Sequence, residues 1–316
     1  MAVHALHYEI ETRLEWGVLR GDAVLPIPGE FPTTGDFVRN VNVADLEALD
    51  GATVPLANLR VLSPVTRNQR FVCQGANYRQ HMIESGMNPD DKNFNMIFTK
   101  APSCIVAADS DIIRPPVSQF LDYEIELGLI LAKDIGRSVD VTNANLHEFV
   151  AGIVMVNDVT ARDIQVPQMQ FYKGKSFRTF GPVGPWLCLL GPDEMHYVEE
   201  MELRLAVNGD VRQQDSSANL VFKPGETLTE LSQVHDFAAG DLLSTGTPAG
   251  CALTVPPPMV QRLAGLLPEA TKWKIFLKKQ AARTQYLKIG DRIESTIRSR
   301  DGKIDLGVQR NLVVQG

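Results

Sequence analysis

DYEIELGLIL at residues 122–131 and GIVMVNDVTARDIQ at residues 152–165 are the two most informative segments of the chain, and both predict strands. In the first segment, apolar residues occupy alternate positions from Tyr123 to Leu131. Side chains on a strand alternate between its two faces, so Glu124 and Glu126 share the face opposite to these apolar residues. Taken alone, this pattern is typical of a half-buried strand whose charged face is solvated.

The second segment places a third carboxylate at the end of a buried strand. Residues 151–156 are almost purely apolar and lead to Asn157 and Asp158, just before a polar turn. An aspartate that ends a buried strand beside Glu124 and Glu126 gathers three oxygen ligands. Such a set suits Mg2+, Mn2+ or Ca2+, whereas zinc prefers histidine and cysteine. The residues therefore predict a divalent-metal site formed by Glu124, Glu126 and Asp158.

The composition is that of a globular protein and excludes several functional classes. A chain of 316 residues, 44% hydrophobic and 22% charged, can form one large domain or two unequal ones. The net charge of −7 argues against a nucleic-acid partner. No apolar run approaches the roughly 18 residues of a membrane span, so we expect no membrane association. The start of the chain lacks the pattern of a signal peptide, and the four cysteines are scattered, so we expect a cytoplasmic protein.

Strand patterns dominate the chain, and few long helices are predicted, which indicates a mixed, β-rich α+β fold. Near the N-terminus we expect two strands in residues 5–27 around a turn at residues 20–22, a loop at 28–40 and a helix at 42–49. Further strands are expected at 71–75, 97–99, 105–107, 112–116 and 182–190, a short helix or a mobile loop at 77–86, helices at 143–150 and 227–237, and hairpins at 201–215 and 289–313. Asn208-Gly209 supplies the turn of the first hairpin.

Five segments, in this order, resemble the fumarylacetoacetate hydrolase family: DYEIELGLIL (122–131), NDVTARDIQ (157–165), YKGKSF (172–177), GPVGPW (181–186) and STGTPAG (244–250). The resemblance covers residues 67–250, with weaker similarity in both tails. It implies the β-roll catalytic domain of that family, which we place at residues 64–316, after a small N-terminal β domain at residues 1–63. It also implies a homodimer.

A histidine and a glutamate in the segment at residues 77–86 are candidates for acid–base chemistry. His81 and Glu84 lie three residues apart, so they share a helix face. By itself, a histidine in a polar segment is usually a surface residue. The segment resembles the lid of the family, in which a His-x-x-Glu pair activates a water molecule. Glu84 would then orient the His81 imidazole and stabilise its cation.

The resemblance also implies catalytic and substrate-binding roles for residues near the carboxylates. Lys175 is a catalytic candidate that would stabilise negative charge on a substrate oxygen, although a lone lysine is usually a surface charge. Thr179 matches a position close to the metal ligands, and Arg178 departs from the aspartate that many members carry there. The candidates for substrate binding are Tyr78, Arg162, Gln165, Thr245 and Gly246. A structural ion pair of Arg162 and a simple tight turn at Thr245-Gly246 are the alternatives.

These implications predict a metal-dependent enzyme that acts on a small 2-oxo acid. The expected reaction is hydrolysis of a carbon–carbon bond in an acylpyruvate or a related 1,3-diketo acid, with Mg2+ or Mn2+ as cofactor. A lyase or isomerase is the alternative, because decarboxylation, tautomerisation and hydration of 2-oxo acids share the same enolate chemistry. The His81–Glu84 pair favours hydrolysis.

The segment at residues 251–287 is longer than the resemblance leads us to expect. Three consecutive prolines at 256–258 require an extended chain. A helix is predicted from Thr271, with Trp273, Phe276 and Leu277 on one face. This helix either packs on its own domain or a dimer partner, or it forms part of the wall of the substrate pocket. If it forms part of that wall, we expect the pocket to admit an acyl group whose size or charge differs from those that shorter relatives accept.

Overall fold

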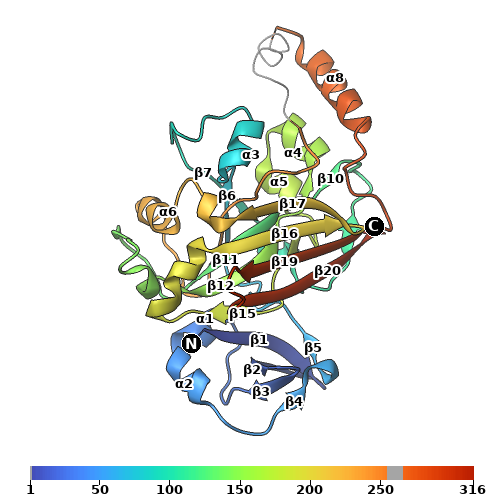
Figure 1. The fold of residues 1–316 in the computed structure, drawn as a ribbon. Coiled ribbons are helices and arrows are strands. Elements are labelled where there is room, and N and C mark those ends of the chain that lie inside the picture. Colours follow the sequence, from blue (N-terminus) through green and yellow to red (C-terminus); the bar gives the residue numbers. More distant parts are fainter. Residues whose placement is uncertain (1, 255–265) are drawn as a thin grey trace.

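The computed structural model describes residues 2–254 and 266–316, and its larger sheet runs through most of the molecule (Figure 1). In the described chain this sheet has 11 strands, and β11 and β12 lie near its middle. The strands in spatial order are β4 (Val54–Pro55), β3 (Ala23–Pro26), β2 (Arg13–Arg20), β1 (Val3–Ile10), β15 (Leu187–Leu189), β12 (Val150–Asn157), β11 (Ile125–Leu131), β18 (Leu242–Ser244), β6 (Phe71–Gly75) and β7 (Met96–Lys100), with β5 (Arg60–Val61) paired to β1.

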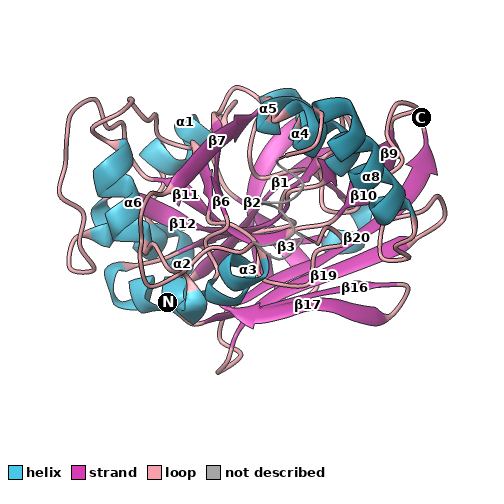
Figure 2. Cartoon of the chain, turned by 90° about the horizontal axis from the view of Figure 1, so that it is seen from above, coloured by secondary structure: helices cyan, strands magenta, loops and turns pink. Residues whose placement is uncertain are grey.

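A second sheet lies along one side of the molecule, as the view from above shows (Figure 2). Its strands in spatial order are β17 (Asp210–Ser216), β16 (Met201–Val207), β19 (Arg292–Ser299), β20 (Asp305–Gln315) and β9 (Ile112–Arg114). Two short pairs complete the strands: β10 (Leu121–Asp122) with β13 (Thr160–Ala161), and β14 (Gly181–Pro182) with β8 (Ile105–Val106). One hydrophobic core joins residues of both large sheets. The predicted β-rich α+β fold of the β-roll type is confirmed.

The helices are short and lie mainly at the ends of the sheets. The α-helices are α1 (Thr34–Asn40), α2 (Val43–Ala48), α3 (Arg79–Glu84), α4 (Arg162–Gln168), α5 (Phe171–Lys175), α6 (Pro224–Leu231) and α8 (Glu269–Ala281). The 3-10 turns are η1 (Leu56–Asn58), η2 (Pro102–Cys104), η3 (Leu146–Glu148), η4 (Pro192–Glu199) and η5 (Ser217–Asn219). Helices α3, α4 and α5 gather at the end of the roll opposite β1–β5 (Figure 1). Among the described residues, no helix combines the length and apolar character that a membrane span requires.

The strands β11 and β12 are buried on both faces, so the half-solvated alternative for the first segment is wrong. They pair antiparallel, with Glu126 opposite Val156 and Ile125 opposite Asn157. Gly128 permits this close packing, because a Cβ atom there would lie 2.7–2.9 Å from side chains on neighbouring strands. The second sheet contributes to this burial, because its strand β16 contacts β11. The two glutamates are therefore enclosed within the protein.

The N-terminal predictions need two corrections. Residues 5–27 contain parts of three strands instead of two, because the chain reverses after Ile10 through a two-residue turn at Glu11 and Thr12. Glu11 adopts φ 56°, a conformation that is uncommon for residues other than glycine, so no residue typical of a tight turn marks this position. The predicted loop at 28–40 contains α1, whose Thr33 side chain accepts a hydrogen bond from the Asp36 amide. Strand β1 pairs with β15 of the larger sheet, and the boundary at residue 63 remains a prediction.

Three other elements differ from their predicted extents. The helix predicted at 143–150 is only the turn η3, and the helix predicted at 227–237 is α6, which begins earlier and ends at Leu231. The strand predicted at 182–190 is divided between β14 and β15, because Gly184 between them has φ 106°, which is not a strand conformation. The predicted hairpins are confirmed, with Asn208 and Gly209 at positive φ in the turn between β16 and β17.

Helix α8 confirms the predicted helix but begins two residues early, at Glu269. It stands away from the body of the protein (Figure 1). Of the predicted apolar face, Leu277 packs against the core, while Trp273 and Phe276 stay half-buried with their ring centroids 5.9 Å apart. The three prolines at 256–258 lie outside the described residues.

Strand β1 carries two enclosed histidines, which predict a loss of stability in acid. Burial lowers the pKa of both His4 and His7 below the ordinary 6.5. The charge of Asp305 partly opposes this shift at His4, and a hydrogen bond with the Ser63 carbonyl partly opposes it at His7. Each histidine therefore binds a proton more readily in the unfolded chain, so stability is fully present above pH 6.5 and is lost as pH falls below it. Urea unfolding at pH values above and below 6.5 should show this decline. In a His4→Gln/His7→Gln double variant the decline should be smaller, and an equal decline would contradict the assignment.

Candidate metal centre and active site

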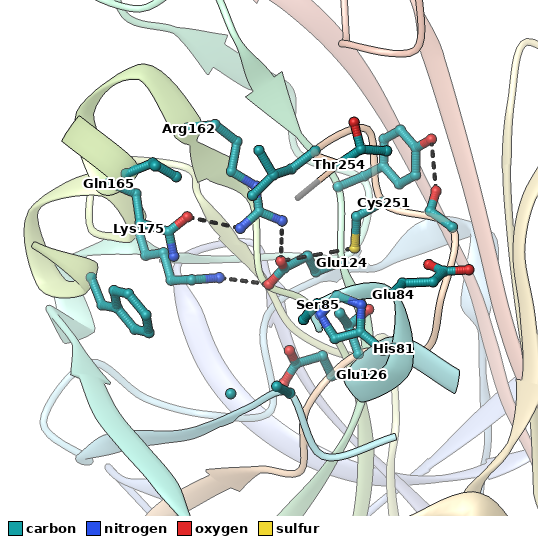
Figure 3. Close-up of a pocket in the computed structure, with 18 of the residues that line it drawn as sticks. His81, Glu84, Ser85, Glu124, Glu126, Arg162, Gln165, Lys175, Cys251 and Thr254 are labelled. Atoms are coloured by element: carbon teal, nitrogen blue, oxygen red, sulfur yellow. Dashed lines mark hydrogen bonds and ion pairs between the residues drawn. The ribbon is translucent and has the colours of Figure 1, made fainter. Parts of the chain in front are cut away.

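A cavity of about 730 Å³ opens beside the central strands. Its lining includes seven of the residues that the sequence singled out: His81, Glu84, Glu124, Glu126, Arg162, Gln165 and Lys175. Figure 3 shows Glu124 between Arg162, Lys175 and Cys251, with the α3 residues His81 and Glu84 on the near side. Residues from distant parts of the chain therefore meet around the β11–β12 pair.

The three predicted metal ligands lie together. Glu124 precedes β11, Glu126 lies within it, and Asp158 follows β12. One carboxylate oxygen from each lies within 4.8 Å of the others. All three side chains are buried, Asp158 completely. The pairing of β11 with β12 explains the arrangement, because Asn157 stands opposite Ile125 and brings Asp158 beside the two glutamates.

Three buried cations surround this cluster. The Lys175 ammonium lies 2.5 Å from Glu124 and 2.6 Å from Asp158, and Lys100 lies 2.5 Å from the other Asp158 oxygen. The Arg162 guanidinium pairs with Asp122 at 2.8 Å and also with Glu124. Counting Asp122, four buried carboxylates face three buried cations, so the cluster retains one uncompensated negative charge.

Glu124 and Glu126 have pKa shifts in opposite directions, because their surroundings differ. Burial by itself raises the pKa of Glu124, but Arg162 and Lys175 outweigh it and lower the pKa to about 2. Burial raises the pKa of Glu126 well above its ordinary value, and the neighbouring Asp158 and Glu124 raise it further. Burial would lower the pKa of Lys175, yet Asp158 and Glu124 raise it, so this lysine stays charged. Glu126 is therefore the carboxyl that no cation of the protein balances, and its neutral form is favoured until a positive charge binds beside it.

The donor set fits a hard divalent cation. Glu124, Glu126 and Asp158 offer only carboxylate oxygens, which Mg2+, Mn2+ and Ca2+ prefer. Glu126 accepts hydrogen bonds at one oxygen, from the Ser244 hydroxyl at 2.5 Å and the Gly246 amide at 3.1 Å. Its other oxygen has no hydrogen bond within the described ranges 2–254 and 266–316. A free oxygen and an uncompensated charge in a buried acidic cluster are what a cation would satisfy, so this triad can bind a divalent metal.

His81 lies in the cavity, but Glu84 does not orient it. The Nδ1 atom of His81 is buried and has no hydrogen-bond partner in the described chain. Burial lowers the pKa of His81, with Glu124 acting in the opposite direction, so the neutral imidazole is favoured. The Glu84 carboxylate points away from the His81 ring (Figure 3) and accepts a 3.5 Å hydrogen bond from Gln80 instead. The predicted His–Glu hydrogen bond is absent from the described part of the structure, although both side chains line the cavity.

Arg162 and Gln165 lie on the first turn of α4, directly after β13. The Arg162 Nη1 atom donates to the Gln165 side chain at 2.8 Å, while its other nitrogens bind Asp122 and Glu124. The structural ion pair that was the alternative role for Arg162 is therefore present, with the nearby carboxylates Asp122 and Glu124 as partners. Both side chains line the cavity, so their predicted role in substrate binding remains open to test.

Three predicted substrate contacts do not line the cavity. The Thr245 hydroxyl donates to the Leu127 carbonyl at 2.8 Å, and the Gly246 amide donates to Glu126. The loop STGTPAG thus supports the metal ligand Glu126 through Gly246. Tyr78 is fully buried, and its hydroxyl has no partner in the described chain. Tyr78, Thr245 and Gly246 are therefore not among the residues that line the cavity.

The two residues noted after Lys175 lie outside the cavity as well. Thr179 adopts φ 70°, and its hydroxyl oxygen accepts a hydrogen bond from the Ile113 amide at 2.8 Å. Arg178 is exposed, so it adds no charge to the cavity wall.

Sequence reasoning missed several residues of the site. Lys100 is buried at the end of β7, where its ammonium also donates to the Phe180 carbonyl at 2.6 Å. The only feature of the sequence that could have indicated a buried Lys100 is its position at the end of a largely apolar strand. Thr247 and Cys251 line the cavity, and the Cys251 sulfur lies 4.0 Å from Glu124. Asp122 stands within the quoted acidic segment, yet its role as the partner of Arg162 depends on the pairing of β10 with β13.

Comparison with known proteins supports this picture. Residues 70–314 match the family model described as fumarylacetoacetate (FAA) hydrolase, C-terminal. A mitochondrial oxaloacetate tautomerase of Bos taurus is 37% identical over 232 residues, which are 73% of this chain and 71% of that protein. The oxaloacetate tautomerase YisK of Bacillus subtilis is 34% identical over 210 residues, covering 66% of this chain and 68% of that protein.

A solved structure is similar along the whole chain. The fumarylacetoacetate hydrolase of the psychrophile Exiguobacterium antarcticum has a TM-score of 0.76 and 28% sequence identity, covering 99% of this chain and 100% of that one. The similarity therefore includes the N-terminal strands that lie outside the matched family region.

Proposed function

The chain belongs to the fumarylacetoacetate hydrolase family, and we propose that it is a divalent-metal-dependent enzyme that interconverts the enol and keto forms of an oxaloacetate-like 2-oxo acid. The observation that carries this proposal is the state of His81. Its ring is in the cavity beside the carboxylates, its Nδ1 atom has no partner in the described chain, and Glu84 does not hold it. Such a histidine suits direct proton exchange with a substrate.

Residues around the cavity would carry out the steps of this reaction. Glu124, Glu126 and Asp158 would hold Mg2+ or Mn2+. When bound, the cation would polarise the 2-oxo group as a Lewis acid. His81 would take the proton from C3 of the keto form, and the electrons of that C–H bond would form the C2–C3 double bond. Lys175 and Arg162 would offset the negative charge that develops on the C2 oxygen. That oxygen would then accept a proton from solvent, and His81 would release its proton to solvent; in the ketonising direction His81 would instead deliver a proton to C3 while the C2 hydroxyl loses one.

Hydrolysis of an acylpyruvate, which the sequence favoured, is the second candidate. It is supported by the position of Glu84 in the same cavity, three residues after His81 on α3. Hydrogen bonds between catalytic groups are often long without substrate and tighten in its presence, so Glu84 remains available to orient His81. In this reaction His81 would deprotonate water instead of C3. The two named tautomerases among the relatives are the reason that this candidate comes second.

The purified protein should therefore accelerate the ketonisation of enol-oxaloacetate in the presence of Mg2+ or Mn2+. The loss of enol absorbance in the ultraviolet measures this rate, with a blank that contains the metal but no protein. Cleavage of acetylpyruvate is measured in parallel. We expect the larger kcat/KM for ketonisation, and a larger value for acetylpyruvate cleavage would replace the first candidate with the second. The expected homodimer and cytoplasmic location remain proposals.

A further inference from the structure

Two arginines line the cavity without taking part in the carboxylate cluster. Arg212 lies in β17, and Arg283 follows α8 by two residues. Within residues 2–254 and 266–316, neither forms an ion pair with Glu124, Glu126 or Asp158. The metal site already has its own cations, so these two positive charges need another explanation.

The side chain of Arg212 has spare hydrogen-bonding capacity. Its Nε atom is buried and has no partner in the described chain. Its nearest acid is Asp210 at 3.8 Å, which is too long for a hydrogen bond. The backbone at this point is fixed, because the neighbouring Gln213 side chain donates to Thr247 and Pro248, and Gly250 packs against the Arg212 carbonyl. A fixed backbone therefore presents an underused guanidinium to the cavity.

Arg283 is anchored at one nitrogen and free at two. Its Nε atom donates to the Ala252 carbonyl at 2.7 Å. Its two terminal nitrogens make no hydrogen bond or ion pair with any described residue. The anchor joins the two ends of the long 251–287 segment, so this segment contributes a positive charge to the cavity wall. Leu253, Thr254 and Gln285 line the cavity as well, whereas no residue of α8 does.

The two arginines act on the same part of the cavity. Gly250 packs against the Arg212 carbonyl, and the Ala252 carbonyl accepts the hydrogen bond from Arg283, so both arginines adjoin residues 250–252 of the cavity wall. The Tyr123 hydroxyl, which also lines the cavity, donates to the Gly250 carbonyl at 3.2 Å in the same stretch. Two guanidinium groups that face one cavity repel each other, and an anion bound between them or beside them would offset that repulsion.

We propose that Arg212 and Arg283 bind the second carboxylate of a 2-oxo diacid and so give the enzyme its preference for diacids over monoacids. This inference rests on the proposed function, which places the oxo group and first carboxylate of the substrate at the Glu124–Glu126–Asp158 site. Guanidinium groups bind carboxylates through paired N–H donors, and such charge-assisted bonds are strong in an enclosed site. A substrate with a neutral far end would leave both charges uncompensated.

The first test measures binding without turnover. Calorimetry in the presence of Mg2+ compares 2-hydroxy diacids of four to six carbons with the 2-hydroxy monoacids of the same length, for example malate with 2-hydroxybutanoate. The parent protein should bind at least one diacid about ten to a hundred times more tightly than its matched monoacid, as expected for hydrogen bonds to a charged group. Arg212→Gln/Arg283→Gln should remove this preference. Arg178→Gln, which changes an exposed arginine outside the cavity, should retain it.

Oxalate is the internal control, because it is too short to have a distant second carboxylate. Its affinity should be the same in the parent and in the double variant, which also shows that the variant is folded. A diacid preference that survives in the double variant, or that the parent lacks at every chain length, would overturn the inference. If the parent shows an arginine-dependent diacid preference but no ketonisation, the proposed reaction fails while this assignment stands.

Discussion

Glu126→Gln should lose ketonisation activity by a factor on the order of 10³, because a bound cation stabilises developing charge by several kcal/mol. The substitution removes one of three carboxylate ligands and keeps the shape of the side chain. The amide oxygen can still accept the hydrogen bonds from Ser244 and Gly246 that Glu126 accepts. We therefore expect the metal-free variant to fold as the parent does, and to differ from it only in metal binding and activity.

Thermal unfolding separates a lost metal site from a damaged fold. A ligand that binds only the folded state stabilises it by mass action. The parent should therefore melt at a higher temperature when Mg2+ or Mn2+ is added after EDTA treatment, whereas Glu126→Gln should show the metal-free value throughout. Full activity of the parent after exhaustive chelation, or an equal metal-induced rise in the variant, would refute the role of the triad.

His81→Ala should lose ketonisation by about 10²–10⁴-fold, the usual contribution of a positioned acid or base. The cavity places this imidazole beside the cluster with an unpaired Nδ1, and burial favours its neutral form. Binding of Mg2+ and oxalate should be unchanged, since His81 is not a ligand in the triad. The exposed His196 is the matched control, and His196→Ala should retain full activity.

Glu84→Gln distinguishes the two candidate reactions. If His81 exchanges a proton directly with the substrate, loss of a carboxylate that does not contact the ring should change the rate little. If a water molecule must be activated, both variants should lose activity to a similar degree. An inactive Glu84→Gln together with an inactive His81→Ala would favour the hydrolase. A His81→Ala enzyme as active as the parent would exclude His81 as the base in either reaction.

The carboxylate cluster could be predicted from the sequence because its geometry depends on one local rule and one strand end. Glu124 and Glu126 share a face through simple alternation, and Asp158 ends an apolar run. The fold class was accessible for a related reason, since strand patterns recur along the chain and five motifs resemble one family. What alternation could not reveal was burial, because the residues that enclose Glu124 and Glu126, among them Arg162, Lys175 and Ser244, come from later parts of the chain.

The rest of the site depends on long-range pairing that no local pattern encodes. Lys100 reaches Asp158 across 58 positions, and Asp122 reaches Arg162 across 40. Helix periodicity placed His81 and Glu84 on one face, but a spacing of three residues does not fix the direction of either side chain. The 251–287 segment is a further example. Its apolar pattern predicted the helix, but no local pattern indicated that Arg283, just after the helix, lines the cavity.

Anomalous diffraction from crystals of the parent protein soaked in Mn2+ tests the central claim most directly, because it locates the cation without reference to any substrate. The account predicts one manganese peak within bonding distance of Glu124, Glu126 and Asp158, and no peak there in Glu126→Gln. A fully occupied manganese site elsewhere in the cavity, with none at these three carboxylates, would contradict it.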